Sequence, residues 1–298
     1  PTHRTYTSAY QTHRPHLTDA GLSAAHPATA VDEFGEIRHG RVAAERALTV
    51  YLDKREMVTL MTLGTRPEML VLGWLHNQRL ITDIHQIKAV QVDWETESAA
   101  ITTFDGIADL DKKTAHKTVT TGCGQGTVFG DLMEDLDKIE LPQRRHLQSG
   151  IYALLKNLSS YNEVYQKAGA VHGCALCRGA EIQLFIEDVG RHNAVDAIAG
   201  HMMLNHTTGA DKLFYTTGRL TSEMVIKVAQ MGIPFLLSRS GATQMGVDLA
   251  KQVGVTLIAR AKGKHFLIYN GAENITFDAI PQVRFKASDS KPAEHAKS

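Results

Sequence analysis

The segment QLFIEDVGRHN, residues 183–193, decides the fold class of this 298-residue chain. It passes from an apolar, strand-like run through an acidic loop with a glycine into a helix expected to begin near Asn193. The same order recurs at 213–216 before a helix, and at 234–237 before the helical residues 247–253, and strand-like runs follow at 255–258 and 265–269. Repeated strand–loop–helix units predict an α/β fold whose mixed, largely parallel sheet binds ligands at the carboxyl ends of its strands.

The residues upstream predict a second, smaller unit. Residues 48–52 and 57–61 are expected to pair as a hairpin that turns at 53–55, and further strands are expected at 87–94 and 99–104. Thr65 followed by Glu68 resembles a capping box, which is expected to open an amphipathic helix through Met69, Leu72 and Leu75. We therefore predict a small α+β module over 41–118 and a larger α/β domain over 119–285.

The two ends of the sequence and its composition exclude several classes of protein. Residues 1–40 and 286–298 show no period and are predicted to be a flexible arm and a flexible tail. Lys plus Arg and Asp plus Glu number 32 each, so no global positive field points to nucleic acid. No apolar run approaches the roughly 20 residues that cross a bilayer, and the N-terminus has no secretory h-region. With three cysteines and no disulfide framework, a cytoplasmic location is expected.

Three of the predicted strand ends carry an arginine beside or near a glycine: Arg191, Arg219 and Arg239. Glycine allows a ligand close to the backbone, helix N-termini offer free N–H groups, and arginine binds phosphate in bidentate fashion. One alternative is that these arginines pair with Glu187, Asp188 and Glu223; for the three loops together we favour a large phosphorylated ligand. The candidate binding residues are Gly190, Arg191, His192, Asn193, Gly218, Arg219, Ser238, Arg239 and Ser240.

Cys123 is the candidate catalytic residue. It lies in the glycine-rich segment TTGCGQGT, residues 120–127, ahead of an expected acidic helix over 128–137. A thiol near a helix N-terminus gains thiolate character, which nucleophilic and sulfur-transfer chemistry requires. A bystander thiol is the alternative, and we favour the reactive role.

Cys174 and Cys177 have the CxxC spacing of metal or redox sites, and His172 precedes them. No second pair follows at zinc-finger spacing, and the segment also fits a buried strand, in which cysteine packs as a small hydrophobic residue. Packing is favoured for Cys177, and less firmly for Cys174.

Three segments together resemble the formate dehydrogenase accessory protein family (FdhD): EDVGRHNAVD at 187–196, TGRLTSEM at 217–224 and SRSGAT at 238–243. Weaker likeness extends the resemblance over roughly residues 45–275. The resemblance implies a cytidine-deaminase-like fold for the larger domain and a sulfurtransferase activity. Such a protein accepts persulfide sulfur from a cysteine desulfurase and passes it to the bis(molybdopterin guanine dinucleotide) molybdenum cofactor of formate dehydrogenase, working as a homodimer.

The sequence departs from this family at one position. The family has a CxxC in the loop that holds Cys123, and here Gly126 stands at the second cysteine position. A persulfide needs one thiol, so transfer through Cys123 alone is expected, without a two-cysteine relay in this loop.

Two other functions are carried as alternatives. The first is a non-catalytic chaperone that binds the molybdenum cofactor or a guanine nucleotide. The second, weaker one is a zinc-dependent, deaminase-like hydrolase, for which the required H/C-x-E and P-C-x-x-C segments are missing. No permanent metal is therefore predicted.

Overall fold

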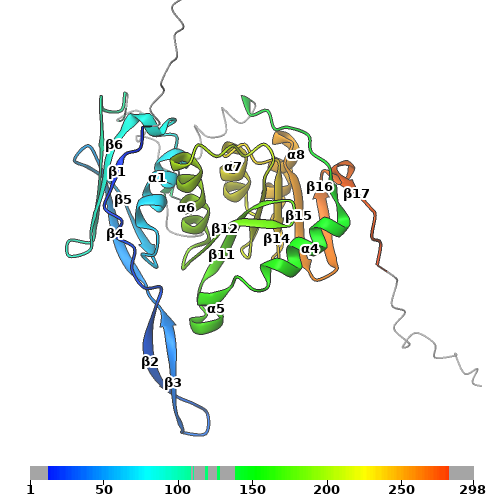
Figure 1. Ribbon diagram of the computed structural model, residues 1–298, viewed down its shortest axis with the longest axis horizontal. Helices are drawn as coiled ribbons and strands as arrows, with labels where there is room; N and C mark the ends of the chain where they lie inside the picture. Colours follow the sequence, from blue (N-terminus) through cyan, green and yellow to red (C-terminus); the bar gives the residue numbers. More distant parts are fainter. Residues whose placement is uncertain (1–12, 109, 111–117, 120–125, 128–137, 282–298) are drawn as a thin grey trace, which may run out of the picture.

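The computed structural model describes residues 13–108, 110, 118–119, 126–127 and 138–281. Figure 1 shows two β-sheets on either side of a central helix pair. The smaller sheet has the strand order β1-β6-β7-β4-β5, and the larger has the order β12-β11-β13-β14-β15-β16. The expected α/β class, with parallel and antiparallel strands, is confirmed.

The smaller sheet follows the predicted strands closely. β4 (Arg46–Leu52) and β5 (Arg55–Thr62) form the expected hairpin, in which Asp53 and Lys54 take positive φ angles of 47° and 73°. Two positive φ angles match the right-handed twist of the flanking strands. The rest of the sheet is β6 (Ile87–Asp93), β7 (Ser98–Thr103) and β1 (His16–Leu17), with the short helix η1 (Ile84–Gln86) before β6.

The larger sheet is more mixed than the sequence indicates. β12 (Glu181–Asp188), β13 (Leu213–Thr216), β14 (Phe235–Ser238) and β15 (Thr256–Lys262) run in one direction. β11 (His172–Arg178) lies antiparallel between β12 and β13, and β16 (His265–Asn270) is antiparallel to β15. The carboxyl ends of β12, β13 and β14 therefore meet at one edge, together with the amino end of β11.

Helices cover both faces of this sheet. α6 (Arg191–Leu204), α7 (Ser222–Gln230) and α8 (Gln244–Val253) pack on one face, and α4 (Gln148–Leu158) packs on the other. The short helix α5 (Glu163–Ala168) precedes β11. The remaining short elements are β8 (Thr118–Val119), β9 (Gly126–Thr127), β10 (His146–Leu147), η3 (Ala272–Asn274) and β17 (Ile275–Thr276).

α1 (Pro67–Asn77) and α6 join the two sheets by an unusually close contact (Figure 1). A Cβ atom on Gly73 would lie 1.7 Å from the Asp196 carbonyl oxygen, and one on Gly200 would lie 1.9 Å from that of Met69. Only glycine fits at either position, so the two helix backbones touch. One continuous apolar core spans both sheets as a result.

Two sequence-based expectations for the N-terminal part are wrong. Residues 25–43 belong to an ordered hairpin, β2 (Ala25–Val31) and β3 (Ile37–Ala43), and not to a flexible arm. The strand β1 likewise pairs with β6. The Thr65–Glu68 capping box does not form, because Glu68 instead accepts a hydrogen bond from the Ala20 main-chain N–H at 2.7 Å. The β1–β6 pairing and the Ala20–Glu68 hydrogen bond join residues far apart in sequence, whereas β2 and β3 pair with each other within one hairpin.

Within the described residues, no helix combines the length and the apolar character that crossing a bilayer requires.

Candidate functional site

The three arginine-bearing loops lie along one edge of the larger sheet. The second and third loops run side by side: the Leu220 N–H donates to the Gly241 carbonyl at 2.9 Å, and the Thr243 N–H donates back to the Leu220 carbonyl at 3.0 Å. The N-termini of α6, α7 and α8 open at the same edge. This is the edge at which open α/β sheets bind their ligands.

Arg191 connects the first loop to the second. It is the first residue of α6, and its side chain lies over Gly218, where a Cβ atom would come within 2.8 Å of Arg191 Cδ. Arg191 is 7% exposed, and its Nε has no hydrogen-bond partner among the described residues. Gly218 is thus a glycine because the arginine occupies the space of a side chain.

Arg219 and Arg239 are exposed at the same edge. Arg239 Cζ stands 5.9 Å from the centre of the Tyr165 ring, on the face of the sheet opposite Arg191. There it borders a pocket of about 560 Å³, which we call the basic pocket. Its floor and walls include Tyr152, Leu155, Leu158 and Tyr215, and its cations are Lys156, Arg239, Lys262 and Lys264.

The acidic residues that could have neutralised the arginines have other partners. Glu187 accepts the main-chain N–H groups of Val164 and Tyr165 at 2.8 and 2.9 Å, at the start of α5. Asp188 accepts from the Thr62 hydroxyl at 2.6 Å and from the Leu63 N–H at 3.2 Å. In the described part of the chain, none of the three predicted arginines forms an ion pair with a carboxylate.

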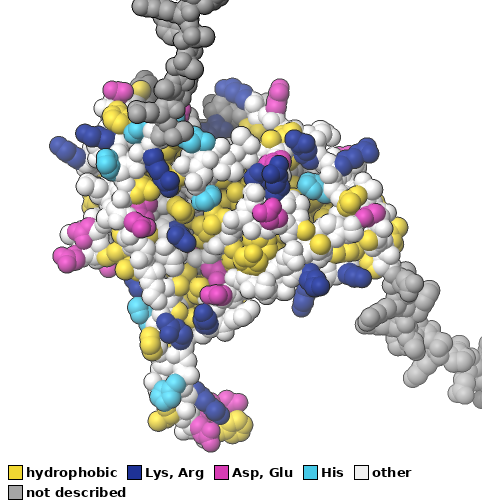
Figure 2. All heavy atoms as spheres, in the orientation of Figure 1, with side chains coloured by type: hydrophobic (Ala, Val, Ile, Leu, Met, Phe, Trp, Pro, Cys, Tyr) yellow, Lys and Arg dark blue, Asp and Glu magenta, His cyan; other side chains and the backbone are white. Residues whose placement is uncertain are grey.

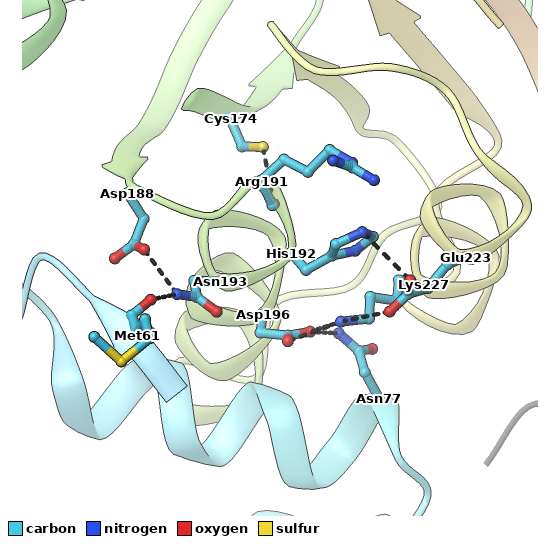
Figure 3. Close-up of polar contacts among 10 residues, drawn as sticks. All are labelled: Met61, Asn77, Cys174, Asp188, Arg191, His192, Asn193, Asp196, Glu223 and Lys227. Carbon is cyan, nitrogen blue, oxygen red and sulfur yellow. Dashed lines mark hydrogen bonds and ion pairs between the residues drawn. The ribbon is translucent and has the colours of Figure 1, made fainter. Parts of the chain in front are cut away.

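Other predicted site residues point away from the edge and hold the loops in place. Asn193 donates to Asp188 Oδ1 at 2.8 Å and to the Met61 carbonyl at 2.6 Å, which ties α6 to β5 (Figure 3). Ser238 Oγ donates to the Gly218 carbonyl at 2.6 Å and accepts from the Ser240 N–H at 2.9 Å. Gly190 is the residue that precedes α6 and has extended backbone.

His192 belongs to a buried polar network that sequence patterns did not reveal. Its Nε2 lies 3.3 Å from Glu223 Oε2, while Lys227 Nζ lies 2.8 Å from both carboxylate oxygens of Asp196 (Figure 3). Asn77 of α1 donates to Asp196 Oδ1 at 2.7 Å. The network therefore links α1, in the N-terminal part of the chain, to α6 and α7.

Folding stability is expected to fall in acid because of His192. Burial, together with the nearby charges of Lys227 and Arg191, lowers the pKa of His192 from 6.5 to about 2. The imidazole is thus neutral in the folded protein but becomes protonated in the unfolded chain below pH 6.5. The contribution of His192 to the free energy of unfolding is therefore fully present above pH 6.5. Below that pH it is lost by about 1.4 kcal/mol per pH unit.

Urea unfolding at pH 7 and at pH 5 checks this prediction. Between pH 7 and pH 5, the free energy of unfolding of His192→Asn should fall by less than that of the unmodified protein. His265 on β16 is exposed, so His265→Asn is the matched control. Its free energy of unfolding should fall by as much as that of the unmodified protein. Equal pH dependence in all three proteins would contradict the assignment.

The two cysteines of β11 cannot act as a pair. Cys174 packs into the core under α6, and Cys177 packs into the core under α4, so their side chains lie on opposite faces of the sheet. Burial raises the pKa of each thiol to about 12. Cys174 instead donates to the Thr216 hydroxyl at 3.3 Å. These two residues cannot chelate one metal ion or form a disulfide with each other, which removes the CxxC support for the zinc alternative.

Among the described residues, no three His, Cys, Asp or Glu side chains are grouped so that they could hold a metal ion. His172, the first residue of β11, is half-buried at the arginine edge. Burial lowers the pKa of His172, and the charges of Arg191 and Arg219 lower it further.

Cys123 and the expected helix over 128–137 lie outside the described residues. The flanking strands β8 and β9 pair, with Val119 opposite Gly126. On the C-terminal side, Ile139 and Leu141 pack against the main core, and Arg144 Nε donates to the Ala210 carbonyl at 3.3 Å, just before β13 begins. Residues 139–144 thus lie near the amino end of β13, whereas the three arginines lie near the carboxyl end of that strand.

Comparisons with known proteins agree with one another. A model described as the FdhD/NarQ family matches residues 43–276. The chain is 32% identical over 250 residues to the sulfur carrier protein FdhD of Bacillus subtilis and 30% identical over 246 residues to that of Listeria monocytogenes; each match spans 82% of this chain and 94% of the relative. A crystal structure described as a formate dehydrogenase accessory protein from Desulfotalea psychrophila is similar with a TM-score of 0.68 and 26% identity, over 86% of this chain and 100% of that one.

Proposed function

Because this chain belongs to the FdhD/NarQ family, we propose that it is a sulfur carrier in the maturation of formate dehydrogenase. The names of its relatives support this role, since those from Bacillus and Listeria are sulfur carrier proteins and the related crystal structure is that of a formate dehydrogenase accessory protein. In the finer form of the proposal, the protein is a sulfurtransferase. It takes persulfide sulfur from a cysteine desulfurase and passes it to the bis(molybdopterin guanine dinucleotide) cofactor before the formate dehydrogenase catalytic subunit receives that cofactor.

The observation that carries cofactor binding is the set of unpaired cations at one edge of the sheet. Arg191, Arg219 and Arg239 lie along that edge without a carboxylate partner in the described chain, Arg239 on the face of the sheet opposite Arg191, and the N-termini of α6, α7 and α8 open beside them. The net charge of the whole protein is zero, so an anionic ligand must be held by local groups such as these. A cofactor with several phosphates supplies matching negative charge, and guanidinium groups bind phosphate in bidentate fashion.

Cys123 is the proposed sulfur carrier. Its thiolate attacks the terminal sulfur of the desulfurase persulfide, the donor S–S bond breaks, and the desulfurase cysteine leaves as a thiolate. The exchange conserves electrons and needs no second thiol, so Gly126 does not prevent it. Cys174 and Cys177 are not substitutes for the missing partner, because their buried thiols remain protonated.

Loading of Cys123 tests the sulfur-carrier proposal. The protein is incubated with a cysteine desulfurase and cysteine, and peptides are analysed by mass spectrometry without reducing agent. We expect one additional sulfur atom on the peptide with Cys123 and none on those with Cys174 or Cys177. Failure to load Cys123, while a known acceptor loads in the same mixture, would refute the proposal.

Gly218→Ala tests the binding site separately. The new methyl group must displace Arg191, so we expect the affinity for guanosine diphosphate to fall about tenfold, equivalent to about 1.4 kcal/mol. Gly241→Ala in the adjacent loop is the matched control, because a Cβ atom there meets nothing within 4 Å. Isothermal titration measures both, and equal affinities for the two variants would contradict a role for Arg191.

The binding-only chaperone remains the second candidate, and Gly126 is the observation that favours it. A carrier without the second loop cysteine could have kept the ligand site and lost sulfur transfer. Under this alternative the Gly218 and Gly241 variants behave as above, but Cys123 never carries sulfur.

A further inference from the structure

Three buried polar atoms at the starts of α6 and α7 have no hydrogen-bond partner among the described residues: Arg191 Nε, His192 Nδ1 and Thr221 Oγ1. His192 Nδ1 is an acceptor, because Nε2 carries the hydrogen that faces Glu223. The other two atoms can donate. Native proteins keep few buried donors without a partner, because each has lost the hydrogen bonds that water supplies to the unfolded chain. Two such donors on neighbouring helix starts therefore point to a bound group that accepts hydrogen bonds.

The Arg191 side chain, 7% exposed, is aimed at the loop that leads into α7. Its stem lies over Gly218, where a Cβ atom would come within 2.8 Å of Arg191 Cδ and 3.1 Å of Arg191 Cβ, and this loop continues directly to Thr221. Figure 3 shows the guanidinium group over the His192 ring, on the side of α7. His192 in turn lies 3.3 Å from Glu223 in the first turn of α7, so the starts of the two helices are in contact.

The N-terminus of α7 has no side-chain cap. Helix N-termini carry main-chain N–H groups without an intrahelical acceptor, together with a partial positive charge. α7 has nine residues, and the side chain of its N-cap residue, Thr221, makes no capping hydrogen bond. At α8, by contrast, the hydroxyl of the N-cap residue Thr243 accepts from the Gly246 N–H at 3.2 Å. The Thr221 hydroxyl is therefore available to a ligand, together with main-chain N–H groups at the start of α7.

The local charge favours an anion. The Arg191 guanidinium stays charged, since arginine is not deprotonated in proteins, and Arg219 is exposed in the loop before α7. Glu223 is the acidic residue in the first turn of α7, and its carboxylate is engaged by His192 and Lys227 at 3.3 and 3.8 Å. Figure 2 shows basic and acidic side chains interspersed over the visible face of the described residues. An anion must therefore be bound by particular groups and not by a broad basic patch on that face.

We propose that Arg191, Thr221 and the N-terminus of α7 bind one tetrahedral oxyanion of the phosphate class. The guanidinium group and the hydroxyl donate to its oxygens, and so do main-chain N–H groups of α7. Thr221, Ser222 and Glu223 are partly exposed, so the anion reaches the site from solvent. The site rests on the proposed function only for the molecule that carries the oxyanion, which is either a phosphate group of a nucleotide or an inorganic oxyanion.

Isothermal titration of inorganic phosphate into the full chain, at constant ionic strength, tests the site. We expect a dissociation constant on the order of 1 mM, which rises at least about tenfold in Arg191→Met and about fivefold in Thr221→Val. Arg191→Met keeps an apolar stem over Gly218, and Thr221→Val keeps the shape of the side chain. Thr102→Val, at an exposed position of β7, is the matched control and should bind phosphate as the unmodified protein does.

Urea unfolding of Thr221→Val, without phosphate, separates binding from structure. Because Thr221 makes no capping hydrogen bond, the free energy of unfolding should not fall when its hydroxyl is replaced by a methyl group. A lower free energy of unfolding combined with unchanged phosphate affinity would assign the hydroxyl a structural role and overturn the proposal.

Titration of phosphate in the presence of saturating guanosine diphosphate identifies the carrier of the oxyanion. If phosphate no longer binds, the site holds a phosphate group of the nucleotide; if phosphate binds equally well, the site holds an inorganic oxyanion. Both results support the site. No phosphate binding to the unmodified protein, or equal binding to it and to both site variants, would overturn the proposal. Sulfur loading of Cys123 depends on neither result, so failure of this site and failure of the sulfur-carrier proposal are distinguishable.

Discussion

Cys123→Ala is expected to reduce formate dehydrogenase maturation to the background level. A carrier that works through one thiol has no second path when that thiol is removed, because Gly126 stands at the other family cysteine position. The measurement is formate dehydrogenase activity in a host that lacks its own family member and is supplied with each variant. Guanosine diphosphate affinity should remain unchanged, because the arginine edge is intact.

Cys174→Ala and Cys177→Ala are the matched controls. Both thiols are buried and protonated, so their removal should leave most of the maturation activity. Full maturation with Cys123→Ala would contradict the sulfur-carrier function and favour the binding-only chaperone.

Lys227→Met is expected to lower the free energy of unfolding by about 3–5 kcal/mol. Lys227 and Asp196 are buried to 2% and 0% exposure, and the lysine also lies 3.8 Å from Glu223. Removing the cation leaves the Asp196 carboxylate in the core with Asn77 as its one side-chain partner among the described residues. Urea unfolding at pH 7 measures the change.

The double variant Lys227→Met/Asp196→Asn separates charge from packing. It removes the uncompensated carboxylate, so it should recover a large part of the lost stability. Lys88→Met on the exposed side of β6 should be close to neutral. A loss below about 1 kcal/mol in Lys227→Met would show that the ion pair does not hold α6 and α7 together.

The elements that could be predicted from sequence are those determined by local pattern. β13 was expected at 213–216 and is found there, and the β4–β5 hairpin turns at the expected residues. The helices α4 and α5 were not anticipated. Residues 175–177 fit the start of a buried strand, and β11 contains them, but its antiparallel place between β12 and β13 depends on contacts that no local pattern encodes. The cytidine-deaminase-like description of the larger domain stays a prediction.

The candidate site divides in the same way. Three arginine loops at one sheet edge follow from strand direction alone, and the structure brings them together. Strand direction does not predict where neighbouring side chains in a loop or helix point. Successive residues in a helix are rotated by about 100°. Arg191 therefore lies over Gly218, His192 turns toward Glu223, and Asn193 turns back toward β5. The basic pocket was missed because its cations come from α4, the end of β14 and the β15–β16 turn, far apart in sequence.

The central claim, that sulfur passes through Cys123 to the cofactor, is tested most directly by following one labelled sulfur atom. The protein is loaded with isotopically labelled sulfur on Cys123, freed of desulfurase, and mixed with the molybdenum cofactor and inactive formate dehydrogenase. We predict that the label leaves Cys123, appears in the enzyme-bound cofactor, and does so in proportion to the activity gained. Activation while the label stays on Cys123 would contradict the account.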